Sequence, residues 1–334
     1  MATDKQKHLE KVLETNDISK HPSIDKFVSK KNEVKDALNK KFSKDMACNS
    51  MDSGSYAKKT AINKKFDIDC YIPFLKKDPN SDQSGFSNLK EMYNSVFDYF
   101  KSEYEDVELT QVRKQRVSIG LVFDIDGEEF TMDVVPGRER PNRNDYNDSN
   151  TDLSLFIHNR SPKEAEEGKK RVKTNIKKHI SLLQGEDRKH ERRVARLLKV
   201  WKTERKAQKG GKLIKSFMME LYTKEAFDNN TNSIPLGLWD KVKMVMNYIV
   251  DNIETNSLVD PANSSNIVSD AMSDSAKSST KTDMKKTVKD IDEDSDKIKE
   301  YFPINEDYND DEDEKDEKSK TSSAASYLNT NKFG

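Results

Sequence analysis

Two stretches of alternating apolar and polar residues constrain the fold of this chain most. In residues 66–72, apolar side chains alternate with Asp67, Asp69 and Tyr71. In residues 117–134, two further alternating runs flank Asp126-Gly127, a pair typical of a tight hairpin turn. Alternation with a period of two indicates strands with one buried face. The sequence therefore predicts a β-rich region in which a strand precedes a hairpin, and Pro136-Gly137 ends the second hairpin strand.

Helical periodicity dominates most other segments. Trp201 belongs to an apolar stripe at helical spacing and is predicted to lie in the core. Gly210-Gly211 should end that helix, and another should begin near Leu213. Residues 138–151, rich in Asn, Asp and Arg, predict a loop. The remaining helices are expected over residues 24–42, 89–100, 238–253 and 269–289.

Charge is distributed unevenly along the chain. Of 334 residues, 36% are charged, and the formal net charge of -1 argues against a general polyanion-binding protein. Residues 163–215 are rich in Lys and Arg, whereas residues 290–317 are rich in Asp and Glu. We expect a mixed α/β unit over residues 1–160 and a helical unit over residues 161–302. Residues 303–334 should form a disordered acidic tail, because they cannot bury enough apolar area to fold alone.

Cysteine content and hydropathy bear on the compartment. Cys48 and Cys70 are too few for a disulfide framework, and the five histidines form no zinc pattern with them. No apolar run approaches the ~18 residues that a membrane span needs, and the first residues contain no apolar signal core. We therefore expect a cytoplasmic protein that needs no membrane.

Three aspartates are candidates for metal binding. Asp67 and Asp69 stand two residues apart on one strand and point to the same face. Such a pair is usually a solvated polar face, but its mutual repulsion is also relieved by a hard cation such as Mg²⁺ or Mn²⁺. Asp133 lies on the polar face of the second hairpin strand. If that strand pairs beside the first, three carboxylates converge and can hold two ions ~3.5–4 Å apart for phosphoryl displacement.

A Gly-Ser pair precedes the first aspartate. Gly54 lets the backbone approach a phosphate closely, and Ser55 offers a hydroxyl at the start of a helix. Taken alone, such a pair is usually an ordinary turn. Tyr56 next to it is equally suited to stacking on a base and to packing beside the turn.

These motifs together resemble a known superfamily. The run GSYAKKTAINKKFDIDCYIPF followed by EFTMDVVPG is similar to the signature of the DNA polymerase β-like nucleotidyltransferases. Within that superfamily it resembles the cyclic GMP–AMP synthase-like and oligoadenylate synthase-like branch, most closely the bacterial CD-NTases. Three later segments extend the resemblance over roughly residues 20–290, namely RRVARLLKVWK, KLIKSFMMELY and LVDPANSSNIVSD.

The resemblance implies a two-lobed α+β fold, with a mixed sheet and a helical C-terminal lobe closing over a nucleotide cleft. Asp67, Asp69 and Asp133 would hold the metals, and Asp133 would also lie near the attacking hydroxyl. The phosphate contacts carried over are Gly54, Ser55, Lys199 and Ser216.

Three features of the chain bear on the roles that the resemblance implies. From the residues alone, Lys199 shares a helix face with Arg192 and Arg196, which a solvated basic face would explain. Ser53 stands where many relatives carry Gln, so the base contacts of the turn are open. The cysteine–histidine zinc insertion, through which the animal DNA sensor is activated by double-stranded DNA, is absent. We therefore expect that this chain requires no DNA for activity.

The implied reaction joins nucleoside triphosphates and releases pyrophosphate. The product would be a cyclic dinucleotide, with a preference for purines, or a cyclic oligonucleotide that reaches a downstream effector in anti-phage defence. A template-independent RNA-tailing or tRNA-type enzyme would use the same triad, with the basic stretch holding its primer. A nucleotide-binding module without catalytic activity is disfavoured, because such a module has no need to keep three carboxylates that repel one another.

The C-terminal segment ends in Gly334, and some bacterial relatives are coupled to ligases of the ubiquitin-activating type. Such a ligase could act on the carboxylate of Gly334, whereas an ordinary frayed terminus is the favoured interpretation.

Overall fold

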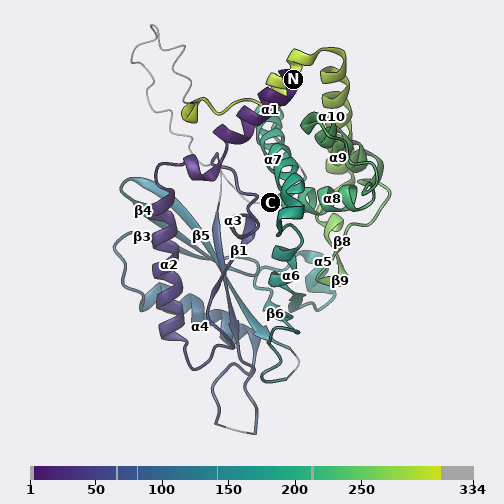
Figure 1. The fold of residues 1–334 in the computed structure, drawn as a ribbon. Coiled ribbons are helices and arrows are strands. Elements are labelled where there is room, and N and C mark those ends of the chain that lie inside the picture. Colours follow the sequence, from purple (N-terminus) through teal and green to yellow (C-terminus); the bar gives the residue numbers. More distant parts are fainter. Residues whose placement is uncertain (1–3, 65–66, 81, 141, 212–213, 310–334) are drawn as a thin grey trace.

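The chain folds into two lobes that lie side by side (Figure 1). The computed structural model describes residues 4–64, 67–80, 82–140, 142–211 and 214–309. Within these residues, seven strands form one mixed sheet in the order β1-β2-β5-β4-β3, and β6 and β7 continue from β5. Most of the longer helices form the second lobe. The two-lobed α+β architecture expected from sequence is confirmed.

The sheet lobe is built around one parallel contact, between β2 and β5, while its other strand pairs are antiparallel. Helices α2 (Ile24–Lys41) and α4 (Leu89–Ser102) supply apolar side chains to a core with the sheet. The strands are β1 (Met51–Ser53), β2 (Ile68–Phe74), β3 (Leu109–Lys114), β4 (Ile119–Ile125), β5 (Glu128–Glu139), β6 (Leu153–Phe156) and β7 (Arg171–Thr174).

The hairpin prediction is confirmed, but its second strand runs further than expected. Asp126 and Gly127 adopt φ values of 56° and 85°, as a tight hairpin turn requires. The expectation that β5 ends at Pro136-Gly137 is wrong. The strand continues through Arg138 and Glu139 because these residues pair with β6. Tyr71 is buried as well, in a small second core on the sheet with Tyr146, Leu153 and Leu155.

The helical lobe surrounds α7 (Lys189–Lys209), which Gly210 ends as predicted. Trp201 of α7 is fully buried, so its predicted place in the core is confirmed. The neighbouring helix begins at Ser216, and Leu213 lies outside the described residues. The other helices of this lobe are α1 (Asp4–Thr15), α8 (Ser216–Asp228), α9 (Leu238–Asn252), α10 (Asp274–Glu293) and α11 (Ile298–Tyr301).

Lobe membership does not follow the order of the chain. Helix α1, expected in the α/β unit, contacts α7 and α9 and contributes Leu9 and Val12 to the core of the helical lobe. Strand β7 extends the sheet beyond residue 161, where only helices were expected. It lies between two short helices, α5 (Pro162–Glu166) and α6 (Ile176–Ser181). A two-stranded ribbon, β8 (Val259–Asp260) with β9 (Asn263–Ile267), precedes α10.

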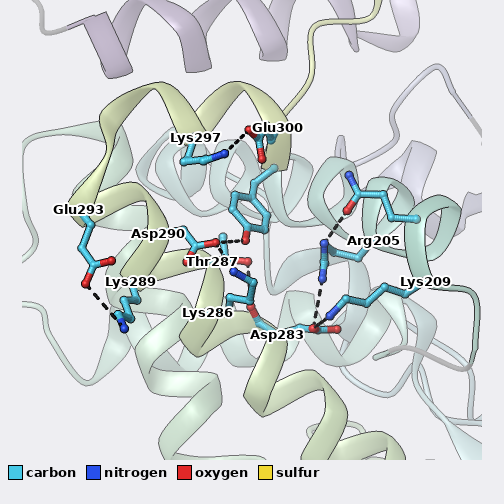
Figure 2. Close-up of polar contacts among 12 residues, drawn as sticks. Arg205, Lys209, Asp283, Lys286, Thr287, Lys289, Asp290, Glu293, Lys297 and Glu300 are labelled. Carbon is cyan, nitrogen blue, oxygen red and sulfur yellow. Dashed lines mark hydrogen bonds and ion pairs between the residues drawn. The ribbon is translucent and has the colours of Figure 1, made fainter.

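Charged and polar side chains attach the C-terminal helices to α7 (Figure 2). Asp283 of α10 binds both Arg205 and Lys209 of α7, the Arg205 Nη2 lying 3.2 Å away. One turn further along α10, Thr287 accepts a 3.0 Å hydrogen bond from the indole of Trp201. These contacts fix α10 across α7.

Ordered structure extends past the boundary expected at Pro303. Asn305 is only 4% exposed, and its side chain donates to Asn63 Oδ1 at 3.0 Å. Its backbone N–H donates to Thr15 Oγ1 at 3.1 Å. Residues 303–309 therefore belong to the folded protein, whereas the rest of the expected tail, with Gly334, lies outside the described residues. Within the described part of the chain, no helix combines the length and apolarity of a membrane span.

We predict that Asn305→Ala lowers the free energy of unfolding by about 1–2 kcal/mol, because the buried Asn63 carbonyl oxygen loses its donor. Thermal or urea unfolding measures this. Glu306→Ala, at the exposed next residue, is the control and should leave stability within about 0.5 kcal/mol of the parent. Equal stability of both variants would show that the hydrogen bonds of Asn305 do not stabilise the fold.

Candidate active site

Two of the predicted aspartates face each other across the parallel strands. In the pairing of β2 with β5, Asp69 is the direct partner of Asp133. Both side chains are largely withdrawn from solvent, and Ser53 of β1 pairs with Asp69 on its other side. The condition for the expected convergence, that the second hairpin strand pairs beside the first strand, is therefore met for Asp69 and Asp133.

Burial and repulsion both act on this carboxylate pair. Burial raises the pKa of Asp69 to about 7, and the negative charges of Asp133 and Asp67 contribute to the rise. The pKa of Asp133 rises to about 6 through burial and the charge of Asp67. A carboxylate pair of this kind is destabilised near neutral pH unless a proton or a cation lies between its members.

Asp133 is held in place by neutral hydrogen-bond donors. Gln115 Nε2 donates to its Oδ1 at 2.9 Å. The Ser118 hydroxyl lies 3.2 Å from its Oδ2 and 2.8 Å from Gln115 Oε1, and it shares its single proton between them. The hydroxyl of Tyr93 fixes the turn that carries both residues by donating to their carbonyl oxygens. A Cβ at Gly120 would lie 2.4 Å from Gln115 Nε2, so glycine leaves the room that this contact needs.

Asp67 lies immediately before β2 and not within it. It is exposed and accepts a 2.6 Å hydrogen bond from Thr131 Oγ1. Across the described ranges, no three His, Cys, Asp or Glu side chains are arranged as a ready metal site. Asp67 accepts a hydrogen bond from Thr131, and Asp133 accepts from Gln115 and Ser118. The charge of Asp67 nevertheless acts on Asp69 and Asp133.

Gly54 lies directly against Asp69. Its φ of 67° favours glycine, and a Cβ there would come within 1.7 Å of Asp69 Oδ2. Helix α3 (Gly54–Ala57) starts at this residue, so Ser55 follows within the first turn. Gly54 thus brings the backbone close to a carboxylate, and its contact with a phosphate stays a prediction.

Two hollows meet at Asp67. One, of about 440 Å³, lies between the lobes and is lined by Ser55, Lys58, Asp67, Asp69, Lys199, Lys202, Lys206, Ser216 and Glu220, among others. The second, of about 280 Å³, lies over β3–β5 and is lined by Asp67, Arg113, Gln115, Thr131 and Asp133, among others. A larger hollow of about 870 Å³ lies between α1, α3 and α7, but none of the three aspartates lines it. The positions of the three aspartates therefore indicate that the two smaller hollows are the candidate active site.

The structure places Lys199 and Ser216 on the wall of the interlobe hollow. The solvated-face interpretation of Lys199 is wrong, because the residue is 7% exposed and its Nζ lies 2.8 Å from Glu220 Oε1. Arg192 is buried too and donates to backbone carbonyls. Ser216 Oγ accepts a 3.0 Å hydrogen bond from Lys202 Nζ. Tyr56 packs against the sheet core beneath Lys31 and does not line this hollow, which favours its packing role.

Sequence reasoning missed four residues of the site. Gln115 and Ser118 had no motif, and only their place at the start of the hairpin could have indicated proximity to Asp133. Lys58 and Glu220 form an ion pair between the lobes, and no local pattern relates positions so far apart.

Two lobes around a carboxylate-bearing sheet are also the architecture of a solved cyclic dinucleotide synthase. Three solved structures share the fold. CdnC of E. coli MS115-1 with ATP gives a TM-score of 0.64 at 18% identity, covering 86% of this chain and 91% of that one. CdnG of Bradyrhizobium diazoefficiens in complex with GTP gives 0.65 at 11%, covering 90% and 95%. Elizabethkingia meningoseptica CdnE cyclic dinucleotide synthase, with GTP and Apcpp, gives 0.55 at 14%, covering 86% and 99%.

The chain belongs to the SMODS family, whose model, the Second Messenger Oligonucleotide or Dinucleotide Synthetase domain, matches residues 1–171. No curated protein matches the sequence significantly. Membership confirms the family expected from the Gly-Ser and aspartate motifs, and with it the nucleotidyltransferase activity that joins nucleotides into a second messenger.

We predict that Gly54→Ala lowers nucleotidyltransferase activity at least about 100-fold, because the new methyl group displaces the Asp69 carboxylate. Gly127→Ala is the matched control, since Gly127 also has a positive φ but no atom within 4 Å of the added Cβ. The control should lose only the ~1–2 kcal/mol of stability that the backbone conformation costs. Similar activities of the two variants would refute the close-contact account.

A second prediction concerns pH without divalent cations. The raised pKa values mean that the folded state binds more protons than the unfolded state between pH ~4 and 7, so these two groups make stability fall as pH rises. Asp69→Asn should remove much of that fall and raise the melting temperature at pH 8 by roughly 2–6 °C, but by less at pH 5. Asp148→Asn, in an exposed loop, is the control. If the melting temperatures of Asp69→Asn and the parent differed by the same amount at pH 5 and pH 8, carboxylate repulsion would not be the cause.

Proposed function

We propose that this chain joins nucleoside triphosphates into a cyclic dinucleotide or cyclic oligonucleotide, using divalent metal ions held by Asp67, Asp69 and Asp133. The observation that carries the proposal is the direct pairing of Asp69 with Asp133 beside the Gly54-Ser55 turn. Family membership supports the product class.

The residues fit a divalent cation of the Mg²⁺ or Mn²⁺ type. Hard carboxylate oxygens are the ligands such ions prefer, and the raised pKa values of Asp69 and Asp133 mark a repulsion that a cation relieves. When bound, the ions would lower the pKa of an attacking hydroxyl and neutralise charge on the triphosphate. Release of the hydrogen bond from Thr131 would free the Asp67 carboxylate to bind a cation.

We place two nucleotides at the two hollows that meet at Asp67. We assign the donor triphosphate to the interlobe hollow, where Ser55, Lys199 and Ser216 line the wall. Its ~440 Å³ falls in the usual range for small-molecule sites. The acceptor nucleotide belongs over β3–β5, where Asp133 lies nearest to its attacking hydroxyl. Gln115 and Ser118 hold Asp133 toward that hollow.

The product would act as a diffusible second messenger on a downstream effector, in keeping with a role in anti-phage defence. No contact with such an effector is needed by this proposal. Action of a ligase on Gly334 stays a separate prediction, tested by co-expression with a cognate ligase and by loss of the adduct in Gly334→Glu.

The test is turnover of all four triphosphates with Mg²⁺. The parent protein should form a phosphatase-resistant cyclic product, identified by mass spectrometry. Replacing both Asp67 and Asp69 with Asn should abolish turnover and leave the fold intact, because the change removes charge without changing shape. Full activity of that double variant would contradict the proposal.

The RNA-tailing alternative rests on the basic residues of α7. Several of them are now engaged, since Arg193 pairs with Glu10, Arg196 with Asp17 and Lys199 with Glu220. A primer site along this helix is therefore less favoured. A strict requirement for added RNA in the same assay would reverse that judgement.

A further inference from the structure

Glu220 of α8 lies buried where the two lobes meet. Its side chain is 4% exposed, and Lys58 of the sheet lobe binds its Oε2. Lys199 of α7 lies 2.8 Å from its Oε1, and Thr60 Oγ1 donates to the same oxygen at 2.6 Å. One carboxylate thus joins two cations and a hydroxyl from both sides of the interlobe hollow.

The two lysines depend on this carboxylate electrostatically. Burial alone would raise the pKa of Glu220, but the charges and hydrogen bonds of Lys58 and Lys199 lower it to about 2. Burial lowers the pKa of Lys199, and the charge of Glu220 opposes that effect. Without Glu220, two neighbouring ammonium groups would lie buried with no counter-charge, which favours neutralisation of Lys199 and withdrawal of Lys58 to solvent.

The lysines also line the hollow assigned to the donor triphosphate. Glu220, Lys58 and Lys199 share that wall with Ser55 and Asp69. Lys58 Nζ is held further by the ring of Phe217, 5.2 Å away. Two ammonium groups on one carboxylate leave a net positive charge facing the hollow, which is what an incoming polyphosphate requires.

We propose that Glu220 is a positioning residue that holds Lys58 and Lys199 in place for the donor triphosphate. The inference rests on the proposed function and deepens it, because neither Glu220 nor Lys58 was carried over from the family motifs. Both carboxylate oxygens of Glu220 are bound by Lys58, Lys199 and Thr60, so it would act through the two lysines.

The test uses Glu220→Gln, which keeps the shape and removes the charge. The dissociation constant of a non-hydrolysable ATP analogue with Mg²⁺, and the KM for ATP, should each rise about tenfold. The kcat should change by less than about threefold, since the reacting atoms are not touched. A variant that only weakens the fold would instead lose melting temperature and kcat with KM unchanged, and that result would overturn the proposal.

A double-variant cycle shows whether Glu220 acts through Lys199. Lys199→Met should weaken analogue binding, and adding Glu220→Gln should cost clearly less than it does in the parent background. Fully additive losses would overturn the coupling. Glu220→Asp keeps the charge on a shorter side chain and should bind with intermediate affinity, which also serves if Glu220→Gln fails to fold.

Glu225→Gln is the matched control on the same helix. Glu225 accepts a hydrogen bond from Tyr248 and does not line the hollow, so its variant should bind the analogue like the parent. If Glu220→Gln bound the ATP analogue as tightly as the parent or more tightly, the inference about Glu220 would be rejected and the proposed function would stand. Absence of any product from the parent protein would instead reject the proposed function.

Discussion

The parallel pairing of β2 with β5 sets the central constraint of this molecule, because it places Asp69 directly opposite Asp133. Two partly buried carboxylates side by side oppose folding near neutral pH. The chain accommodates them locally. Gly54 and Gly120 leave the space that a Cβ would fill, and Gln115 donates to Asp133 without adding positive charge. The repulsion remains available to be relieved by a bound cation.

The helical lobe complements this negative centre with positive charge. Lys199 and Lys202 of α7 line the hollow that the carboxylates close on the opposite side. Glu220 orders the charge on this wall, since it binds Lys199 of the helical lobe together with Lys58 of the sheet lobe. A triphosphate between the lobes would therefore lie between ordered cations on one wall and metal-binding carboxylates on the other. The same ion pairs connect the lobes, which links nucleotide binding to their relative position.

Sequence patterns predicted the parts of the fold that depend on local periodicity. The alternation around Asp126-Gly127 predicted the hairpin, and the apolar stripe ending at Trp201 predicted α7. Strand β7 escaped notice because its residues alternate weakly and gain their order from β6. Helix α1 was assigned to the wrong lobe, since its partners α7 and α9 begin only at Lys189 and Leu238, far along the chain.

The candidate site divides in the same way. Gly54, Ser55 and the aspartates could be predicted because their spacing is local and resembles a family signature. The burial of Lys199 could not be predicted from sequence. The helical pattern gives the face on which Lys199 lies, but it does not show that Glu220 and Thr60 lie beside it. The hydrogen bonds of Gln115 and Ser118 to Asp133 depend on strand register, which alternation alone leaves open.

Manganese binding tests the central claim most directly. Electron paramagnetic resonance can count Mn²⁺ bound to the protein with a non-hydrolysable ATP analogue, against the analogue alone. The account predicts two ions per chain in the parent protein, close enough to couple magnetically, and loss of that coupled pair in Asp133→Asn. Manganese uptake equal to that of the free analogue, or an unaltered pair in Asp133→Asn, would contradict it.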